Sequence, residues 1–242
     1  MRIVSKTDTG RVRRSNQDSY LTGEISGSVA WAVVCDGMGG ANGGNVASAM
    51  AVKTISEHIN SAYRDGMSSN SIRYLLMSAV SAANADVFDA AQNNDTLFGM
   101  GTTVVAVIIV NGIAHIAHAG DSRAYLINEN GMEQITRDHS VVQSMIENGE
   151  ITEEEAKHHP NRNVITRALG VNERIDADYN EINLTDGDAI LICTDGLTNY
   201  VENDRILKII KNHNFYEYPE KLIETANNNG GGDNITVVMM SA

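Results

Sequence analysis

Aspartates that stand where an apolar, strand-like run meets a glycine constrain this chain more than any other feature. They are Asp36 before Gly37, Asp195 before Gly196, and Asp121 after Gly120, and two further acids, Asp18 and Asp233, belong to the same set. A stiff β-branched strand fixes the direction of its last side chain, and a glycine allows close backbone approach. Carboxylates held together at a sheet end repel one another unless a cation lies between them. Because oxygen ligands suit hard ions, the pattern predicts a site for divalent metal ions such as Mg²⁺ or Mn²⁺.

Composition predicts one globular domain. No Pro/Gly/Ser-rich linker divides the 242 residues, and 42% of them are apolar, which suffices for a full core. The longest apolar run, residues 104–110, is far shorter than the roughly 18 to 20 residues of a membrane span. The N-terminus lacks the apolar stretch of a secretory signal, so we expect a cytoplasmic protein with no membrane partner. A net charge of −13 argues against nucleic acid as a partner.

The two cysteines, Cys35 and Cys193, both lie within apolar runs just before the acids. A disulfide between them is open if the two strands are neighbours. The interpretation we favour is that each is a small buried hydrophobic residue, and neither is read as a nucleophile.

Hydrophobic periodicity predicts an α+β protein with antiparallel sheets. Strand-like stretches occupy residues 2–5, 19–23, 29–35, 102–110, 113–119, 123–128, 175–180, 189–194 and 235–240. Helical periodicity covers residues 72–87, and further helices are expected at 44 to about 60, near 204–211 and at 219–228. Asn111-Gly112 joins two of the strands and is a strong signal for a two-residue hairpin.

The strand signal disappears between Asp138 and Arg167. A short helical stretch follows Ser140, and Thr152 with Glu155 three residues later forms a capping box that opens a second one. This part of the chain is expected to be a small insertion over one end of the sheets.

Five motifs appear in one order along the chain. They are residues 7–18, Asp36-Gly37-Met38-Gly39-Gly40, Ala119-Gly120-Asp121-Ser122-Arg123, Thr194-Asp195-Gly196 and Gly232-Asp233-Asn234. This ordered set resembles the metal-dependent protein phosphatases of the PPM/PP2C family in their compact bacterial form, and the resemblance extends from Thr7 to Val238. The glycines near Asp36 do not form a nucleotide-binding motif. They miss the G-x-G-x-x-G spacing of a dinucleotide-binding loop by one position, and no Gly-Lys of a P-loop follows. Considered without the other motifs, the glycine loop after Asp36 is equally well explained as a tight turn that leads into a helix.

The resemblance implies a four-layer α/β/β/α sandwich, in which two antiparallel sheets are flanked by helix pairs. Residues 1–242 would form a single phosphatase domain with a flap insertion at about 139–166, and the protein would be a monomer. The Thr166-Arg167-Ala168-Leu169-Gly170 stretch is similar to the family's return from its flap.

The resemblance also implies two Mn²⁺ or Mg²⁺ ions, with a weaker third ion in addition. Asp36 would bridge the first two metals with help from the Gly37 carbonyl, and Asp195 and Asp233 would hold the first. Asp18 would fix waters on the metals, although a turn acid is the alternative at this position. Asp121 would hold the third metal together with Asp195, and its alternative is a hairpin-turn acid.

Hydrolysis of a phosphate ester fits these residues. A hydroxide held between two metals would attack phosphorus directly without a phosphoenzyme. Asp36 and Arg13 would be catalytic, and Arg13 would grip the substrate phosphate through its guanidinium, whereas Arg11 and Arg14 are read as solvated surface charges. Gln17 and Met38 depart from the Glu and His of many eukaryotic members, so the sequence names no general acid.

The function that follows is a protein serine/threonine phosphatase acting on phosphoserine and phosphothreonine proteins, a bacterial Ser/Thr kinase among them. Two alternatives stay open, namely a phosphatase of a small phosphorylated metabolite and a non-catalytic binding module. The histidines are weak signals. His115 and His118 point to opposite faces of a strand and cannot share a metal. His139 is interpreted as a surface or structural residue, with only substrate contact open to it.

Overall fold

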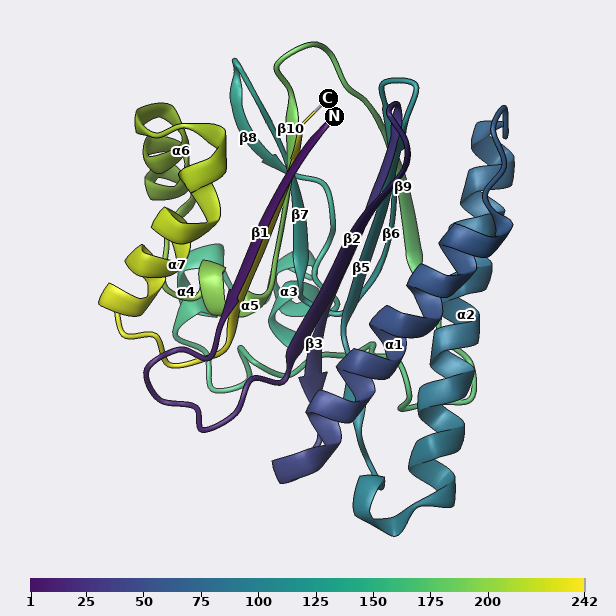
Figure 1. Ribbon diagram of the computed structural model, residues 1–242. Coiled ribbons are helices and arrows are strands. Elements are labelled where there is room, and N and C mark those ends of the chain that lie inside the picture. The colour runs from purple at the N-terminus through teal and green to yellow at the C-terminus, as the bar shows by residue number, and fades with distance from the viewer. Residues whose placement is uncertain (242) are drawn as a thin grey trace.

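Two antiparallel sheets lie face to face at the centre of the structure, a computed structural model that describes residues 1–241 apart from the side chains at positions 26 and 40–42 (Figure 1). The β10 sheet has the order β1 (Arg2–Asp8), β11 (Ile235–Ser241), β10 (Ala189–Cys193), β7 (Arg123–Asn128) and β8 (Gly131–Gln134). The β3 sheet has the order β2 (Asp18–Ser26), β3 (Val29–Met38), β5 (Val104–Val110), β6 (Ile113–Ala119) and β9 (Asp178–Asn183), and β4 (Gly101–Thr102) pairs with the end of β3.

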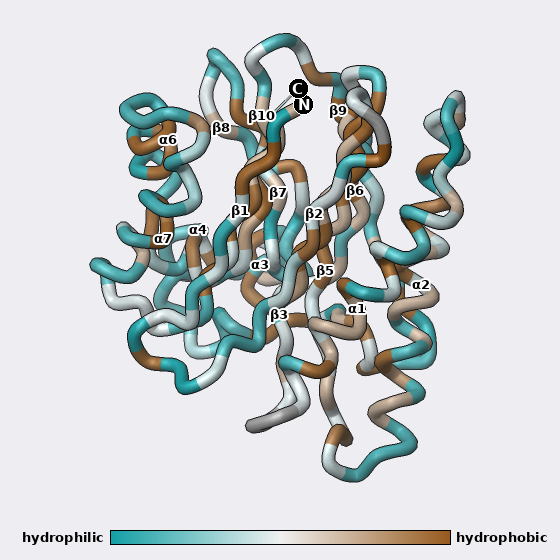
Figure 2. The backbone as a smooth tube through the Cα atoms, viewed as in Figure 1, coloured by the Kyte–Doolittle hydropathy of each residue, from teal (hydrophilic) through white to brown (hydrophobic). Residues whose placement is uncertain are grey.

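The sheets are held together by apolar side chains that alternate along the central strands. Val34, Val105 and Ile109 from the β3 sheet pack in one cluster with Ile192 and Val238 from the β10 sheet. Burying a side chain of this size stabilises the fold by about 1.5–3 kcal/mol. Because the intervening residues face the helices, the central strands are buried on both sides. Figure 2 shows the hydrophobic residues along these strands.

A pair of helices covers the outer face of each sheet (Figure 1). The long pair α1 (Gly40–Ala62) and α2 (Ser69–Asn93) covers the β3 sheet, and α6 (Asn203–Asn212) and α7 (Tyr218–Asn228) cover the β10 sheet. Three short helices lie in the connections between these elements: η1 (Asp95–Leu97), α5 (Asp195–Thr198) and η2 (Phe215–Glu217). The predicted four-layer α/β/β/α sandwich is therefore confirmed.

Strand direction brings the predicted acids to one end of the sandwich. Asp36 near the end of β3 lies opposite Asp18 at the start of β2, because these strands are antiparallel. The end of β10 is likewise paired with the start of β11, so Asp195 and Asp233 flank the same edge. The two chain termini lie at the opposite end (Figure 1).

The insertion forms a flap at the acidic end. It contains α3 (Val141–Glu147) and α4 (Glu153–Lys157), and the predicted capping box of Thr152 and Glu155 opens α4. An antiparallel bridge between Ser140 and Ile165 closes its base.

The structure differs from the sequence-based expectations in a few elements. The four-residue edge strand β8 was not predicted, and β9 starts three residues later than expected, at Asp178. The Asn111-Gly112 hairpin is confirmed, with φ of 52° and 73°. Cys35 and Cys193 are buried free thiols on different sheets, which fits the favoured interpretation and not a disulfide. Among residues 1–241, each helix is too short or too polar to cross a membrane.

Candidate metal centre

A cleft of about 420 Å³ opens between the sheet ends and the flap. Six of the seven predicted site residues line it, namely Arg13, Asp36, Gly37, Asp121, Asp195 and Asp233. The seventh, Asp18, is buried, with 7% of its surface exposed. Other parts of the lining were not predicted and include Thr103 as well as Asn163 and Ile165 from the flap. The structure thus gathers acids from across the chain into one place.

The backbone of Asp36 is held on both sides by a pair of threonines. Its N–H donates to Thr103 Oγ1 at 2.9 Å, and its carbonyl accepts from the Thr103 N–H at 2.8 Å and from Thr102 Oγ1 at 2.8 Å. Thr103 Oγ1 also lies 2.7 Å from Ser122 Oγ, next to Asp121. These hydroxyls fix the direction in which the Asp36 carboxylate enters the cleft, and sequence reasoning missed them.

Gly37 is required by close packing at the junction of β3 and α1. A Cβ at this position would lie 2.0 Å from the Gly44 carbonyl oxygen and 2.7 Å from that of Gln17. The Gly37 N–H also donates to the Gln17 carbonyl at 3.1 Å. The strand end and helix start can therefore approach closely only if this residue has no side chain.

Asp18 connects the two sheets from beneath the cleft. Its Oδ2 accepts hydrogen bonds from the hydroxyls of Thr194 at 2.9 Å and Thr236 at 2.6 Å, both from the β10 sheet. Burial raises its pKa to about 7, and this effect outweighs the two hydroxyl donors. The acid is held in one orientation, which fits its predicted role of positioning groups above it.

Asp195 and Asp233 lie at the ends of neighbouring strands. Asp195 is the first residue of α5, and its Oδ2 accepts from the Asn199 side chain at 2.9 Å. Asp233 accepts from its neighbour's N–H, that of Asn234, at 2.8 Å through Oδ1 and from Arg13 at 2.8 Å through Oδ2. Both acids are thus oriented by local contacts.

Asn234 ties the N-terminal loop to this edge. Its side chain donates to the carbonyls of Thr9 and Ser15 and accepts from the Gln17 N–H at 2.8 Å. The loop between these anchors contains Arg13, whose side chain is 51% exposed and bonds Asp233 only through Nη2 among the described residues. The remaining guanidinium nitrogens are free to bind an anion in the cleft.

The electrostatics of the cleft fit a divalent cation. The pKa of Asp36 is raised well above its ordinary value by burial and by the charges of Asp18, Asp195 and Asp121, in that order. Burial also raises the pKa of Asp195 to about 6 and that of Asp121 to about 7. Oδ1 of Asp18 and Oδ1 of Asp195 are buried and have no hydrogen-bond partner among the described residues. An unpaired buried oxygen costs about 1–3 kcal/mol, so an all-oxygen set of this kind matches a hard metal ion.

The histidines gather in a way that the sequence did not suggest. His115 and His118 point apart as predicted, and His115 Nδ1 lies 2.7 Å from the Tyr179 hydroxyl. His118, however, lies with His139 and Asp178, whose potential ligand atoms are all within 4.8 Å of one another. His139 is 5% exposed, so it is a buried structural residue and not a surface one.

Comparison with known proteins places the chain in a family. The family model for protein phosphatase 2C matches residues 10–236. A curated relative, the serine/threonine phosphatase stp of Listeria innocua, is 36% identical over 244 residues, which cover 99% of this chain and 95% of the relative.

Comparison with solved structures indicates the same family. The serine/threonine phosphatase of S. agalactiae superposes with a TM-score of 0.91 at 34% identity, with 98% of each chain covered. The catalytic domain of the phosphatase PstP, solved in complex with two manganese ions, superposes with a TM-score of 0.86 at 33% identity and covers 98% of this chain and 96% of its own. The predicted family and enzyme class, a serine/threonine phosphatase, are confirmed, and the chain belongs to the protein phosphatase 2C family.

Proposed function

We propose that the acidic cleft is the catalytic site of a metal-dependent protein serine/threonine phosphatase that uses Mn²⁺ or Mg²⁺. The observation that carries this proposal is the convergence of Asp36, Asp195, Asp233 and Asp121 on one cleft, with Asp18 beneath them. The two manganese ions bound by the PstP catalytic domain support the choice of cofactor.

Each residue has a defined part in this proposal. Bound divalent ions supply an activated water and neutralise charge on phosphate oxygens. Asp36 lies at the centre of the acids, and its carboxylate would serve two ions. The adjoining Gly37 carbonyl would help to hold one of these ions, and Asp195 and Asp233 would hold the first. Asp18 keeps its orientation through Thr194 and would orient water.

Arg13 and Asp121 occupy the rim of the same cleft. Arg13 is half exposed and carries free guanidinium nitrogens, so it can bind two oxygens of a substrate phosphate. Asp121 lies on the Asp195 side, where the charge of Asp195 adds to burial in raising the pKa of Asp121, and would hold a weaker third ion.

The substrates follow from the family and the open cleft. We infer that phosphoserine and phosphothreonine proteins are dephosphorylated, a bacterial Ser/Thr kinase among them. We also infer that residues 1–242 act as one domain, as a monomer in the cytoplasm, with the flap at about 139–166 beside the substrate.

The test is release of inorganic phosphate from a phosphothreonine peptide by the full chain, with Mn²⁺ or with EDTA. We expect turnover with Mn²⁺, none with EDTA, and none for Asp36→Asn, because the shared carboxylate charge is lost. Asp186→Asn, an exposed acid at the other end of the sheets, is the matched control and should keep full activity.

Other outcomes would contradict the proposal in different ways. Faster hydrolysis of phosphosugars or nucleotides than of phosphopeptides at equal Mn²⁺ would indicate a metabolite phosphatase. Release of no phosphate from any of these substrates would indicate a binding module.

A further inference from the structure

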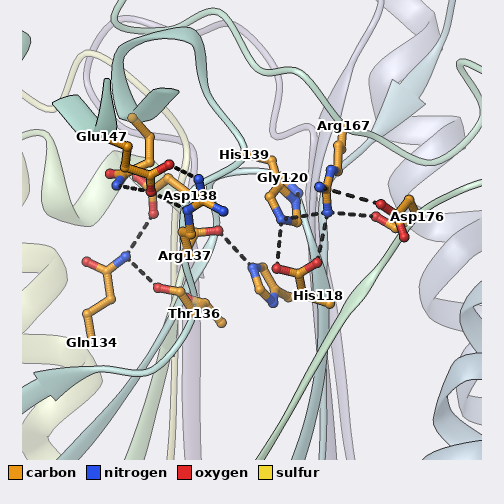
Figure 3. Close-up of polar contacts among 12 residues, drawn as sticks. His118, Gly120, Gln134, Thr136, Arg137, Asp138, His139, Glu147, Arg167 and Asp176 are labelled. Carbon is orange, nitrogen blue, oxygen red and sulfur yellow. Dashed lines mark hydrogen bonds and ion pairs between the residues drawn. The ribbon is translucent and has the colours of Figure 1, made fainter. Parts of the chain in front are cut away.

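Two consecutive residues at the base of the flap hold the segment that contains Asp121 from both sides. Asp138 accepts hydrogen bonds from Arg123 Nε at 2.9 Å and Nη2 at 2.6 Å. His139 Nδ1 accepts from the Gly120 N–H at 3.2 Å, and the His139 N–H donates to the Gly120 carbonyl at 2.9 Å. Figure 3 shows His139 beside Gly120, with Asp138 next to it in the chain.

The His139 ring is fixed in orientation, with Nδ1 toward Gly120 and Nε2 toward Asp178 and Arg167. Nε2 lies 3.3 Å from Asp178 Oδ2, and Asp178 in turn accepts from Arg167 at 2.8 Å. The ring also stacks on His118, with centroids 4.7 Å apart and an interplanar angle of 13°.

A metal ion between His118, His139 and Asp178 is a weaker explanation of this cluster. Arg167 Nη1 lies 3.1 Å from His139 Nε2 and donates to Asp178 Oδ1 at 2.8 Å. A guanidinium therefore already supplies the positive charge that the Asp178 carboxylate requires. Arg167 also pairs with Asp176, as Figure 3 shows.

His139 is also the point at which both ends of the flap meet. Its carbonyl accepts from the Thr166 N–H at 2.8 Å, and the Ser140–Ile165 bridge follows directly. On the other side, Arg137 forms an ion pair with Glu147 on α3 (Figure 3). A movement of the flap is therefore transmitted to Gly120 through one side chain and one peptide group.

The Asp121 carboxylate depends on this support. Among the side chains that the structure describes, none donates a hydrogen bond to it, and its hydrogen bond comes from its own backbone N–H. Its direction is therefore set by the backbone of its own segment. Gly120 has φ of 111°, and a Cβ there would lie 2.6 Å from Thr103 Cγ2. The segment is therefore held from either side of Asp121, by Asp138 and His139 and by the contact of Ser122 with Thr103.

We propose that His139, supported by Asp178 and together with Asp138, is a positioning residue that directs the Asp121 carboxylate into the cleft. It thereby sets the affinity of the cleft for the weaker of its metal ions and couples that affinity to the flap. This inference rests on the proposed function.

The test is calorimetric titration of the full, chelator-treated chain with Mn²⁺ alone. His139→Asn places a carbonyl oxygen near the position of Nδ1 and keeps the acceptor for Gly120, whereas His139→Gln has a similar polarity but reaches the position of Nε2. We expect wild type to show tight and weak Mn²⁺ binding and Asp121→Ala to lose the weak binding. His139→Gln should weaken only the weak binding, by roughly 10-fold or more, as loss of a group that orients a ligand commonly does. His139→Asn should stay near wild type.

Two controls separate positioning from general damage to the fold. His115→Gln alters another buried histidine, which is 1% exposed and bonds Tyr179 away from the cleft, and should leave all Mn²⁺ binding unchanged. If His139 acts through Asp121, the double variant His139→Gln/Asp121→Ala should bind Mn²⁺ as Asp121→Ala does, because effects through one group do not add.

Several results would overturn the inference. They are a wild type without weak binding, equal weakening of the tight binding by His139→Gln, a like effect of His115→Gln, or additive effects in the double variant. A different result would contradict the proposed function, namely that wild type releases no phosphate when its tight sites are filled with Mn²⁺.

Discussion

Charge crowding is the main physical feature at the scale of single residues. Burial raises the pKa of Asp18 and Asp121 to about 7 from an ordinary value of 3.8, and neighbouring acids add to the shift. Holding these acids close together despite their mutual repulsion lowers the stability of the fold, as expected of a site that binds cations.

This crowding predicts a pH dependence of stability. A raised pKa means that the folded state binds more protons than the unfolded state between pH 3.8 and about 7. The unfolding free energy of the metal-free protein therefore contains a term that falls as pH rises through this window. Mn²⁺ replaces the protons, so the gain in Tm from Mn²⁺ over EDTA should grow from pH 5 to pH 7.5. The lowered pKa values of His118 and His139 are common to both conditions and largely cancel in this comparison. A gain that stays constant with pH, measured by scanning calorimetry, would contradict the account.

Arg13 gives a second prediction at this scale. Its guanidinium pairs with Asp233 but leaves nitrogens free for phosphate, so Arg13→Ala should raise KM for a phosphopeptide more than it lowers kcat. Steady-state kinetics at saturating Mn²⁺ provide the measurement, and Arg14→Ala, another exposed arginine of this loop, is the control. An unchanged KM in Arg13→Ala would remove this residue from phosphate binding.

Sequence reasoning found the acids but not the groups that orient them. Four of the five aspartates could be predicted because each follows or precedes a glycine beside a recognisable strand, whereas Asp18 followed from the family resemblance. Thr103, Thr236 and Asn234 act through hydrogen bonds to segments far away in the sequence, and hydroxyls and amides of this kind have no periodic signal. The proximity of Asn234 to Asp233 was the one local indication available.

At the scale of elements, the junction of β3 and α1 is a tightly constrained connection. Gly37→Ala should lower the unfolding free energy by about 1–3 kcal/mol, since its Cβ would meet the Gly44 carbonyl oxygen at 2.0 Å. Gly27→Ala, where a Cβ meets nothing within 4 Å, is the control and should be nearly neutral. Urea unfolding of both variants makes the comparison, and equal stability would show that the junction is looser than the structure indicates.

The predicted helices were confirmed where the hydrophobic periodicity extends over many residues or where a capping motif marks the start of the helix. α2 shows buried side chains at Ile72, Leu75 and Leu76, and the capping box of α4 is present. The edge strand β8 escaped prediction because it has only four residues and is partly exposed. α5 escaped because its four residues look like the turn after a strand.

At the scale of the whole molecule, the site depends on the pairing of strands from both halves of the chain. β10 lies between β7 and β11, so Asp121, Asp195 and Asp233 reach one edge from three separate segments. The layered fold followed from the family resemblance and the strand pattern, whereas the strand order did not follow from periodicity. The coupling between the flap and Asp121 likewise required the structure, because Asp138 and His139 contact residues 15 or more positions away.

Anomalous diffraction from a crystal of this protein grown with Mn²⁺ tests most directly whether these acids converge on a pair of metal ions. We expect two strong manganese peaks in the cleft, with the Asp36 carboxylate between them and with Asp195 and Asp233 next to one of the two. Peaks elsewhere, or a cleft without anomalous density at saturating Mn²⁺, would contradict this expectation.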